Sequence, residues 1–244
     1  DQRGETHDAL VVLQLFIPIH GFTAFSGMAD VIVILYLLLI PAMAAMLGGA
    51  ASGSPYAGIG LSREMVTIIS CELPLVLVLL AVGKVAGGDS VTFSMSNIVK
   101  FQLDNGSLIT HASLIPAAIA FLLIIPGETG SHPFDTAEAE TEICEGLLAE
   151  YSGGPLAVFK LTNSIKLLTM TSLFTALFLG GIGVGIPAVD ALIMFAFSVV
   201  ITIVTVSLVH AVTARLKIEQ VFKYYWTIVT ALALVSLVMA WYGL

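Results

Sequence analysis

The sequence predicts an all-α protein, a polytopic bundle of transmembrane helices. Hydrophobic residues make up 58% of the 244 residues and charged residues only 11%, whereas a soluble globular domain is about half apolar and a quarter charged. The mean hydropathy is +1.02. The apolar stretches are long and do not alternate with polar residues, which argues against the strands of an outer-membrane barrel and favours helices.

Seven apolar stretches are each long enough, at roughly 17–25 residues, to cross the hydrocarbon of a bilayer as a helix. The first is the weakest, because Pro18 and His20 lie inside it. We therefore expect a single integral membrane domain over residues 1–244. In chain order the stretches cover residues 8–25, 29–48, 62–85, 108–126, 155–180, 187–212 and 222–241, and a loop of small residues, 49–61, separates the second from the third.

The basic residues predict the orientation. If every stretch crosses the membrane, the N-terminus and the loops around residues 49–61, 127–153 and 213–221 share one side. Basic residues favour that side by five to two, which makes it cytoplasmic by the positive-inside rule. The two sets are Arg3, Arg63, Arg215, Lys217 and Lys223 on that side, and Lys84 and Lys100 opposite. The chain begins at Asp1 without a leader pattern, so we expect N-terminal sequence to be missing.

A strongly acidic loop, residues 127–153, separates the fourth and fifth stretches. No Lys or Arg lies between Lys100 and Lys160 to balance it. Unpaired carboxylates in a low dielectric cost several kcal/mol or take up protons. Protons, Lys160 and Lys166, or another subunit must therefore balance its charge. The seven carboxylates are Glu128, Asp135, Glu138, Glu140, Glu142, Glu145 and Glu150.

The middle of the acidic loop is predicted to be a helix. Asp135 and Glu138 fit a capping box, and Pro133 just before it fits a helix start. On that helix Glu138, Glu142 and Glu145 would share a face, with Glu140 pointing elsewhere. Such a face would titrate as a coupled group able to hold and pass protons. The alternative is a solvated acidic helix that a basic partner neutralises, with Asp135 and Glu138 acting only as caps.

Ionisable residues also lie within the third stretch. Glu72 is in the middle of it, where an ionisable side chain is expensive and is a functional candidate, and Pro74 loosens the helix nearby. The alternative for Glu72 is a neutral carboxyl hydrogen-bonded to a neighbouring helix. Glu64 lies about two turns away on a similar side. Because it adjoins Arg63 at the membrane edge, we expect these two to form an interfacial ion pair.

Two lysines in the fifth stretch could pair with these acids. Lys166 lies too deep to reach the interface easily, so we expect it to have a buried partner, and Asn163 would extend its polar stripe. Lys160 could instead extend to the near interface. His132 in the acidic loop could relay protons near neutral pH, although a solvated loop histidine is the alternative.

Several classes of protein are excluded. No basic stripe is present to neutralise phosphates, so a nucleic-acid partner is not expected. Cys71 and Cys144 lack metal-ligand spacing, and the five histidines show no ligand pattern. No nucleophile elbow, P-loop or dinucleotide fingerprint occurs. We expect no catalytic residue, cofactor or metal site in this chain, and lipid around it.

Four segments resemble a known family. GETGSHPFDTAEAETEICEGLLAEYSGGPLAVFKL, which begins at Gly127, is similar to the heel subunit of respiratory complex I, with its ET, PFD, spaced glutamates and EYSG. SREMVTIISCE, from Ser62, resembles the membrane glutamate segment of that subunit. SGSPYAGIGLSRE and ARLKIEQVFKYYWT resemble the homologous membrane-anchor subunit of energy-converting group 4 nickel–iron hydrogenases. The resemblance covers nearly the whole chain.

Two departures favour the hydrogenase branch over a quinone reductase. Complex I usually has Arg where this chain has Ser131 and His132, and ICEGLLAEYSG is of the hydrogenase type. The family has eight spans, which implies that the first span and a basic amphipathic segment are missing here. The family positions matched are Glu72, Glu128, Asp135, Glu138, Glu140, Glu142 and Glu150, and Glu145 lies in the hydrogenase-type Glu-Gly step.

The resemblance implies a role in coupling. The subunit would anchor a cytoplasmic redox arm to the cytoplasmic membrane of a prokaryote. Its acids would link ferredoxin-linked hydrogen evolution to proton or sodium translocation. The implied partners are hydrogenase large and small subunits, an iron–sulfur subunit and antiporter-like membrane subunits, which would hold the nickel–iron centre and the iron–sulfur clusters. A complex-I-type subunit at a quinone chamber, a relative that reduces sulfur compounds, and a purely structural anchor are the alternatives.

Overall fold

The computed structural model describes residues 30–88, 90–182 and 187–243. Its regular elements over these residues are helical, which confirms the predicted all-α class. The first predicted stretch, residues 8–25, lies outside the described residues. The principal helices are α2 (Val31–Ser52), α3 (Pro55–Gly87), α4 (Met95–Asn105), α5 (Ile115–Glu128), α7 (Gly154–Phe178), α8 (Pro187–Thr202), α9 (Val209–Val212), α10 (Ile218–Tyr224) and α11 (Thr230–Tyr242).

Two π-helical segments join helices into longer rods. Ile203–Leu208 (η4) joins α8 to α9, and Tyr225–Val229 (η5) joins α10 to α11. The remaining elements are short: α6 is Glu140–Ile143, and the 3₁₀ turns η1, η2 and η3 are Leu108–Thr110, Ala112–Leu114 and Gly146–Leu148.

Four helical segments among the described residues are long and apolar enough to cross a membrane. They are Val31–Ser52, Pro55–Gly87, Val189–Val212 and Ile218–Tyr242, and they correspond to the second, third, sixth and seventh predicted stretches. The fourth stretch is the shorter apolar helix Ala112–Glu128. The fifth is α7, which has 25 residues but carries lysines and hydroxyl residues that leave it outside the set of four. The predicted count of seven spans is therefore supported only in part.

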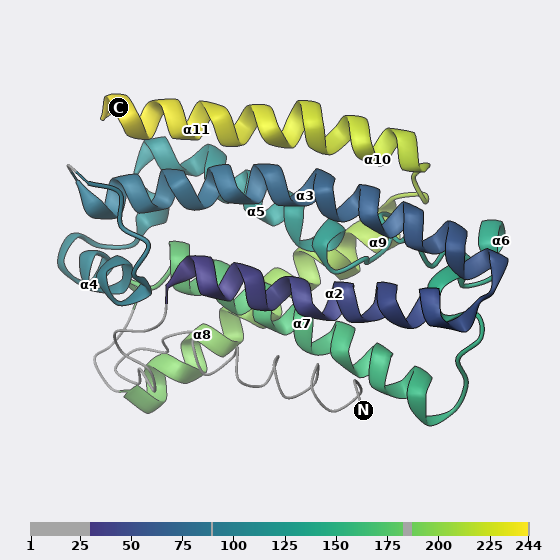
Figure 1. The fold of residues 1–244 in the computed structure, drawn as a ribbon. Helices are drawn as coiled ribbons and strands as arrows, with labels where there is room; N and C mark the ends of the chain where they lie inside the picture. Colours follow the sequence, from purple (N-terminus) through teal and green to yellow (C-terminus); the bar gives the residue numbers. More distant parts are fainter. Residues whose placement is uncertain (1–29, 89, 183–186, 244) are drawn as a thin grey trace.

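The long helices lie alongside one another (Figure 1). The α10–α11 rod runs along α3, and α7 and α8 lie on the other side of the bundle, with α6 and α4 at opposite ends. Aromatic side chains join α5 to α7: the Phe121 ring centroid lies 5.7 Å from that of Phe174 and 6.1 Å from that of Phe178. On α8 apolar side chains such as Leu192 and Phe195 are exposed, as suits a surface that faces lipid.

The expected loop of small residues over 49–61 is wrong. In the structure α2 continues to Ser52 and α3 begins at Pro55, so two residues connect them. Gly53 ends α2 with a left-handed backbone at φ 68°, and proline at the first position of a helix is favourable. Gly60 lets the acidic loop approach α3, because a Cβ atom there would lie 2.8 Å from the Leu147 amide nitrogen.

Candidate functional site

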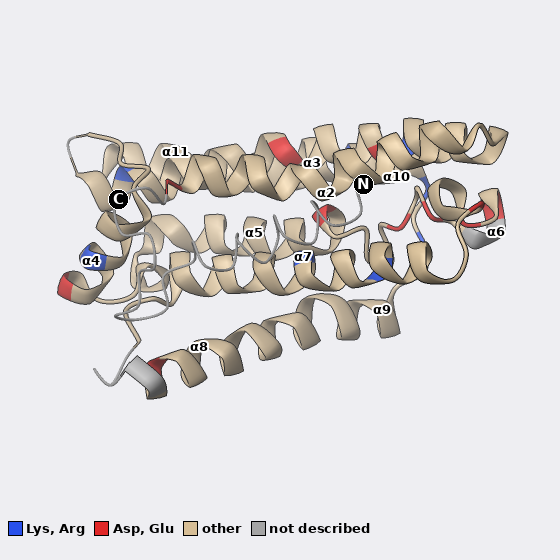
Figure 2. Ribbon diagram, turned by 60° about the horizontal axis from the view of Figure 1, so that its bottom comes forward, with Lys and Arg blue, Asp and Glu red and all other residues tan. Residues whose placement is uncertain are grey.

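The acidic loop is mostly irregular, and the predicted helix with its capping box is wrong. Asp135 and Glu138 precede α6, which has only four residues and begins at Glu140. Cys144 and Glu145 have positive φ angles of 51° and 65°, which end the helix at once. Glu138, Glu142 and Glu145 therefore do not share a helical face. In Figure 2 the acids of this loop gather at the end of the bundle that carries α6.

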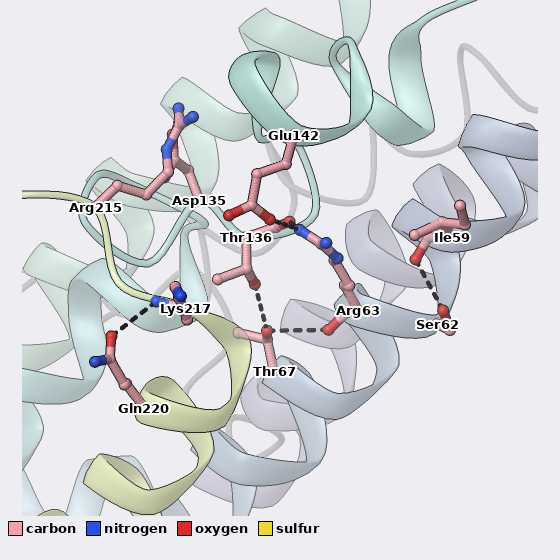
Figure 3. Close-up of polar contacts among 10 residues, drawn as sticks. All are labelled: Ile59, Ser62, Arg63, Thr67, Asp135, Thr136, Glu142, Arg215, Lys217 and Gln220. Atoms are coloured by element: carbon pink, nitrogen blue, oxygen red, sulfur yellow. Dashed lines mark hydrogen bonds and ion pairs between the residues drawn. The ribbon is translucent and has the colours of Figure 1, made fainter.

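Asp135 binds an arginine rather than the amides of a helix start. Arg215 Nε donates to Asp135 Oδ1 at 2.9 Å, and Nη2 donates to Oδ2 at 2.6 Å. A two-point contact of this kind is a strong geometry for binding a carboxylate, and the two side chains lie beside each other in Figure 3. The Leu216 amide also donates to the Pro133 carbonyl at 3.1 Å. The segment between α9 and α10 is thus tied to the acidic loop, a link that we did not predict.

Arg63 also binds the acidic loop, and the predicted Arg63–Glu64 ion pair is wrong. An Arg63 Nη1 atom lies 2.5 Å from Glu142 Oε2 and 3.3 Å from the Thr136 carbonyl oxygen (Figure 3). The Thr67 and Thr136 hydroxyls are 3.2 Å apart beside it. Successive helical residues point about 100° apart, so Arg63 meets the loop while Glu64 turns to the interior.

Lys166 has the buried partner that we predicted. Its Nζ lies 3.1 Å from Glu128 Oε1, with side-chain exposures of 4% and 2%. The same ammonium group donates to the Glu128 main-chain carbonyl. Among the described residues Glu128 Oε2 is buried without a hydrogen-bond partner. Lys160, on the same helix, is exposed, as expected of a lysine that extends to the interface.

A small cavity joins these groups. Its volume is about 40 Å³, enough for about two or three water molecules. It lies between α2, α3, α7 and the acidic loop, and Asn163 and Thr162 add polar groups to its wall. Its ionisable lining residues are Glu64, Glu128, Asp135, Glu138 and Lys166. Four carboxyl-bearing residues and one lysine thus line one partly open cavity.

Glu138 is positioned to exchange a proton near neutral pH. Burial raises the pKa of its carboxyl from 4.5 to about 7, and the charge of Glu64 adds to the increase. Lys160 opposes the increase, whereas Asp135 and Glu145 reinforce it. A carboxyl group with a pKa near 7 can both accept and release a proton under physiological conditions. The geometry can therefore support proton exchange at the cavity.

Glu72 lines a different cavity from these acids, although it is within electrostatic reach of Glu128. It lines a second cavity of about 240 Å³ between α2 and α3, together with Tyr36 and Phe93. Eight helical residues turn through about 800°, which leaves the two positions about 80° apart. We predicted that Glu64 and Glu72 lie on a similar side of α3. Their side chains instead line different cavities, so this prediction is wrong.

The remaining candidates lie around the acidic loop. Glu150 is exposed and Glu145 is partly buried, while Glu140 begins α6. The His132 ring packs against that of His210 with centroids 4.7 Å apart. Its Nδ1 lies 3.8 Å from Asp135 Oδ1. Within the described residues no group of three or more His, Cys, Asp or Glu could hold a metal ion.

Comparison with known proteins identifies the family. A family model described as NADH dehydrogenase matches residues 8–241. The chain belongs to the NADH dehydrogenase family. This confirms the resemblance that the sequence motifs indicated.

The proteins similar to this chain include subunits with two kinds of name. Hydrogenase-4 component C of Escherichia coli is 38% identical over 172 residues, which cover 70% of this chain and 53% of that protein. NADH-quinone oxidoreductase subunit 8 of Thermus thermophilus is 33% identical over 204 residues, covering 82% of this chain and 54% of that protein. The chain spans about half the length of these relatives.

A solved structure extends the likeness to three dimensions. A chain of the membrane-bound sulfane sulfur reductase, an archaeal respiratory membrane complex, superposes with a TM-score of 0.88 at 29% identity. The match covers 98% of this chain and 78% of that one. This NADH dehydrogenase family member is accordingly a membrane protein of the type found in multi-subunit respiratory complexes.

The contact between Arg215 and Asp135 predicts that the acidic loop loosens when it is broken. Arg215→Gln is expected to destabilise the loop by about 1.5–3 kcal/mol, the usual contribution of hydrogen bonds to charged groups. The measurement is the rate of limited proteolysis between residues 130 and 150. Lys217→Gln, at an exposed neighbouring position, is the control. Equal cleavage rates in the two variants would contradict the structural role of this contact.

Proposed function

We propose that this chain is an ion-translocating membrane subunit of a multi-subunit energy-converting hydrogenase. It anchors a cytoplasmic redox arm and couples ferredoxin-linked hydrogen evolution to proton or sodium translocation. The observation that carries the proposal is the cavity shared by Glu64, Glu128, Glu138 and Lys166. Buried ionisable groups that perturb one another in a cavity are candidates for a functional site.

The proposed mechanism uses the proximity of these groups. Electron transfer in the docked arm changes the local charge near the acidic loop. Glu138, with a pKa of about 7, then takes up or releases a proton. The proton then passes through the cavity to Glu64 of α3 and to the pair formed by Glu128 of α5 and Lys166 of α7, which line the same cavity. From there it moves toward antiporter-like partner subunits.

The redox centres are assigned to partner subunits. The chain has two cysteines, Cys71 and Cys144, without the spacing of iron–sulfur or nickel ligands. A nickel–iron centre and iron–sulfur clusters would therefore belong to hydrogenase large and small subunits and to an iron–sulfur subunit. In this arrangement the acidic loop faces the cytoplasm of a prokaryote, where the redox arm docks.

The likeness to the sulfane sulfur reductase supports a second candidate function. In that case this chain would be the membrane subunit of a complex that reduces sulfur compounds, and the reduction itself would take place in partner chains. Copurification separates the candidates: a nickel-binding large subunit with hydrogen evolution supports the hydrogenase. Sulfane sulfur reduction without hydrogen evolution supports the second candidate. Quinone-dependent, inhibitor-sensitive turnover would instead support a complex-I-type subunit at a quinone chamber.

Neutralising Glu138 tests the role of the cavity. In membrane vesicles with the complete complex, Glu138→Gln is expected to lower coupled ion transport at pH 7 at least about tenfold while electron transfer from reduced viologen continues, because glutamine cannot exchange a proton. Glu219→Gln, at an exposed position in α10, serves as the control and is expected to transport normally.

One outcome would favour a purely structural anchor. If neutralising Glu138, Glu140 and Glu142 together weakened docking of the redox arm but left transport per assembled complex unchanged, the acids would serve only to bind a basic partner. The coupling role would then be wrong.

A separate prediction concerns Glu72. Glu72→Gln is expected to keep assembly and electron transfer with artificial donors but to lose coupled ion transport, because an ionisable residue in mid-membrane is expensive unless it functions. Transport is measured by ion uptake into sealed vesicles. Full transport in this variant would remove Glu72 from the pathway without affecting the cavity around Glu138.

A further inference from the structure

Three elements, α3, α5 and η5, meet closely at Gly127, the residue before Glu128. A Cβ atom on Gly127 would overlap the Tyr225 hydroxyl and lie 2.9 Å from Cys71 Sγ. Real Cβ contacts are essentially never that short, so any larger residue would push α5 away from α3 and from η5. The main chain that carries Glu128 is therefore held between two other elements, neither of which contributes to the Glu128–Lys166 ion pair itself.

Tyr225 bonds the turn of α5 that leads into Glu128. The side chain is completely buried, and its hydroxyl donates to the Leu123 carbonyl at 3.0 Å. Pro126 lies in the same turn and has no amide hydrogen, so this turn lacks one of its own hydrogen bonds. A bond from outside the helix therefore has a larger effect here than it would in an unbroken turn.

The same tyrosine also contacts the segment that follows Glu128. Its ring centroid lies 5.2 Å from that of Phe134, a lining residue of the cavity. Glu128 is thus flanked by one contact of Tyr225 on the α5 side and one on the acidic-loop side. Aromatic contacts of this kind are directional and resist reorientation.

A π-helical turn places Tyr225 there. Tyr225 begins η5, and the wide turn is closed by the Thr230 hydroxyl, which donates to the Tyr225 carbonyl at 2.7 Å. Such turns insert one residue into a helix and occur frequently at functional sites. Without the inserted residue, the side chains that follow it would point in other directions relative to those that precede it on the α10–α11 rod.

We propose that Tyr225 is a positioning residue for the Glu128–Lys166 pair. Its hydroxyl fixes the last turn of α5 and its ring fixes Phe134, so that Glu128 Oε1 stays within reach of Lys166 Nζ. The inference rests on the proposed function, in which this pair carries charge. The titratable groups around Glu128 are Lys166 from α7, Glu64, Cys71 and Glu72 from α3, Asp135 and Glu138 from the acidic loop, and Tyr225 itself.

Removing only the hydroxyl tests the proposal. In vesicles with the complete complex, Tyr225→Phe is expected to lower ion transport about three- to tenfold, the effect of one buried hydrogen bond. Its pH profile is expected to shift by at least about half a pH unit, while electron transfer from reduced viologen stays unchanged. Thr230→Val removes the hydroxyl that closes the π-helical turn. This variant is expected to change ion transport and its pH profile in the same direction as Tyr225→Phe.

The matched control is Tyr224→Phe. This neighbour is half-buried and its ring also contacts Phe134, at 5.7 Å, and the variant is expected to behave as wild type. Wild-type transport and pH profile in both Tyr225→Phe and Thr230→Val would overturn the proposal. So would an equal effect of Tyr224→Phe, or a parallel loss of electron transfer, which would indicate a structural role alone.

Glu128→Gln separates this inference from the function on which it rests. If Glu128→Gln stops transport but Tyr225→Phe behaves as wild type, only the positioning role of Tyr225 is wrong. If Glu128→Gln transports normally, the proposed function itself is wrong at this pair, whatever Tyr225→Phe does.

Discussion

Lys166→Met is expected to lower the free energy of unfolding by about 3–5 kcal/mol, because it leaves a buried carboxylate without its partner. Glu128 is only 2% exposed, and one of its oxygens already lacks a hydrogen bond within the described structure. Methionine keeps most of the volume of lysine, so the loss measures the charge pair rather than a void. The measurement is the unfolding midpoint of the detergent-solubilised complex.

A second substitution distinguishes the pair from its surroundings. Adding Glu128→Gln to Lys166→Met removes both charges and is expected to recover much of the lost stability, since replacing a whole buried pair is far less harmful than breaking it. Lys160→Met, on the exposed face of α7, is expected to stay within about 0.5 kcal/mol of wild type. A Lys166→Met effect no larger than that of Lys160→Met would contradict the buried pair.

Glu138 makes stability depend on pH in the opposite sense to an ordinary salt-bridged acid. Because its folded pKa is raised from 4.5 to about 7, the folded chain holds this proton more tightly than the unfolded chain. Well below pH 4.5 the Glu138 carboxyl is protonated in both the folded and the unfolded state, so it costs no stability. As the pH rises from there to about 7, the unfolded state ionises first and folding becomes less favourable, by up to about 3 kcal/mol.

Glu138→Gln should remove this penalty. The variant is expected to be about 1–3 kcal/mol more stable than wild type at pH 8 and equal to it near pH 4.5. Partial exposure of Glu138 favours the lower part of that range. Unfolding midpoints of both proteins between pH 4.5 and 8 supply the measurement. A difference that is constant with pH, or of opposite sign, would show that burial does not raise this pKa.

The opposing effects of one substitution are informative. Glu138→Gln should stabilise the protein while it lowers coupled transport. A residue kept at the expense of stability is expected where function requires it.

The positions of most long helices along the chain were predictable from the sequence, because apolar runs of membrane length leave the backbone few alternatives to helix. The buried partner of Lys166 was also predictable, since a lysine that deep cannot reach the interface. The span count was less secure: α5 is short and α7 carries polar residues that face the cavity.

The acidic loop could not be derived from local patterns. A capping box describes only neighbouring residues, whereas Arg215, 80 residues away, binds Asp135 and removes it from that role. Arg63 likewise forms its ion pair with Glu142 rather than with the adjacent Glu64. The sequence indicated these two arginine partners only indirectly, because both were expected on the same side of the membrane as the acidic loop. The cavity arises from four separate elements, and no single stretch of sequence contains it.

In the proposed function, the acids around the cavity change protonation when electrons pass through the complex. Infrared difference spectroscopy of the complete complex, recorded on reduction by viologen, reads this directly in the carboxyl stretching region. We predict a carboxyl band that appears or disappears on reduction at pH 7, is absent in Glu138→Gln and is retained in Glu219→Gln. An unchanged carboxyl band in Glu138→Gln, or no carboxyl signal in the wild type, would contradict the claim.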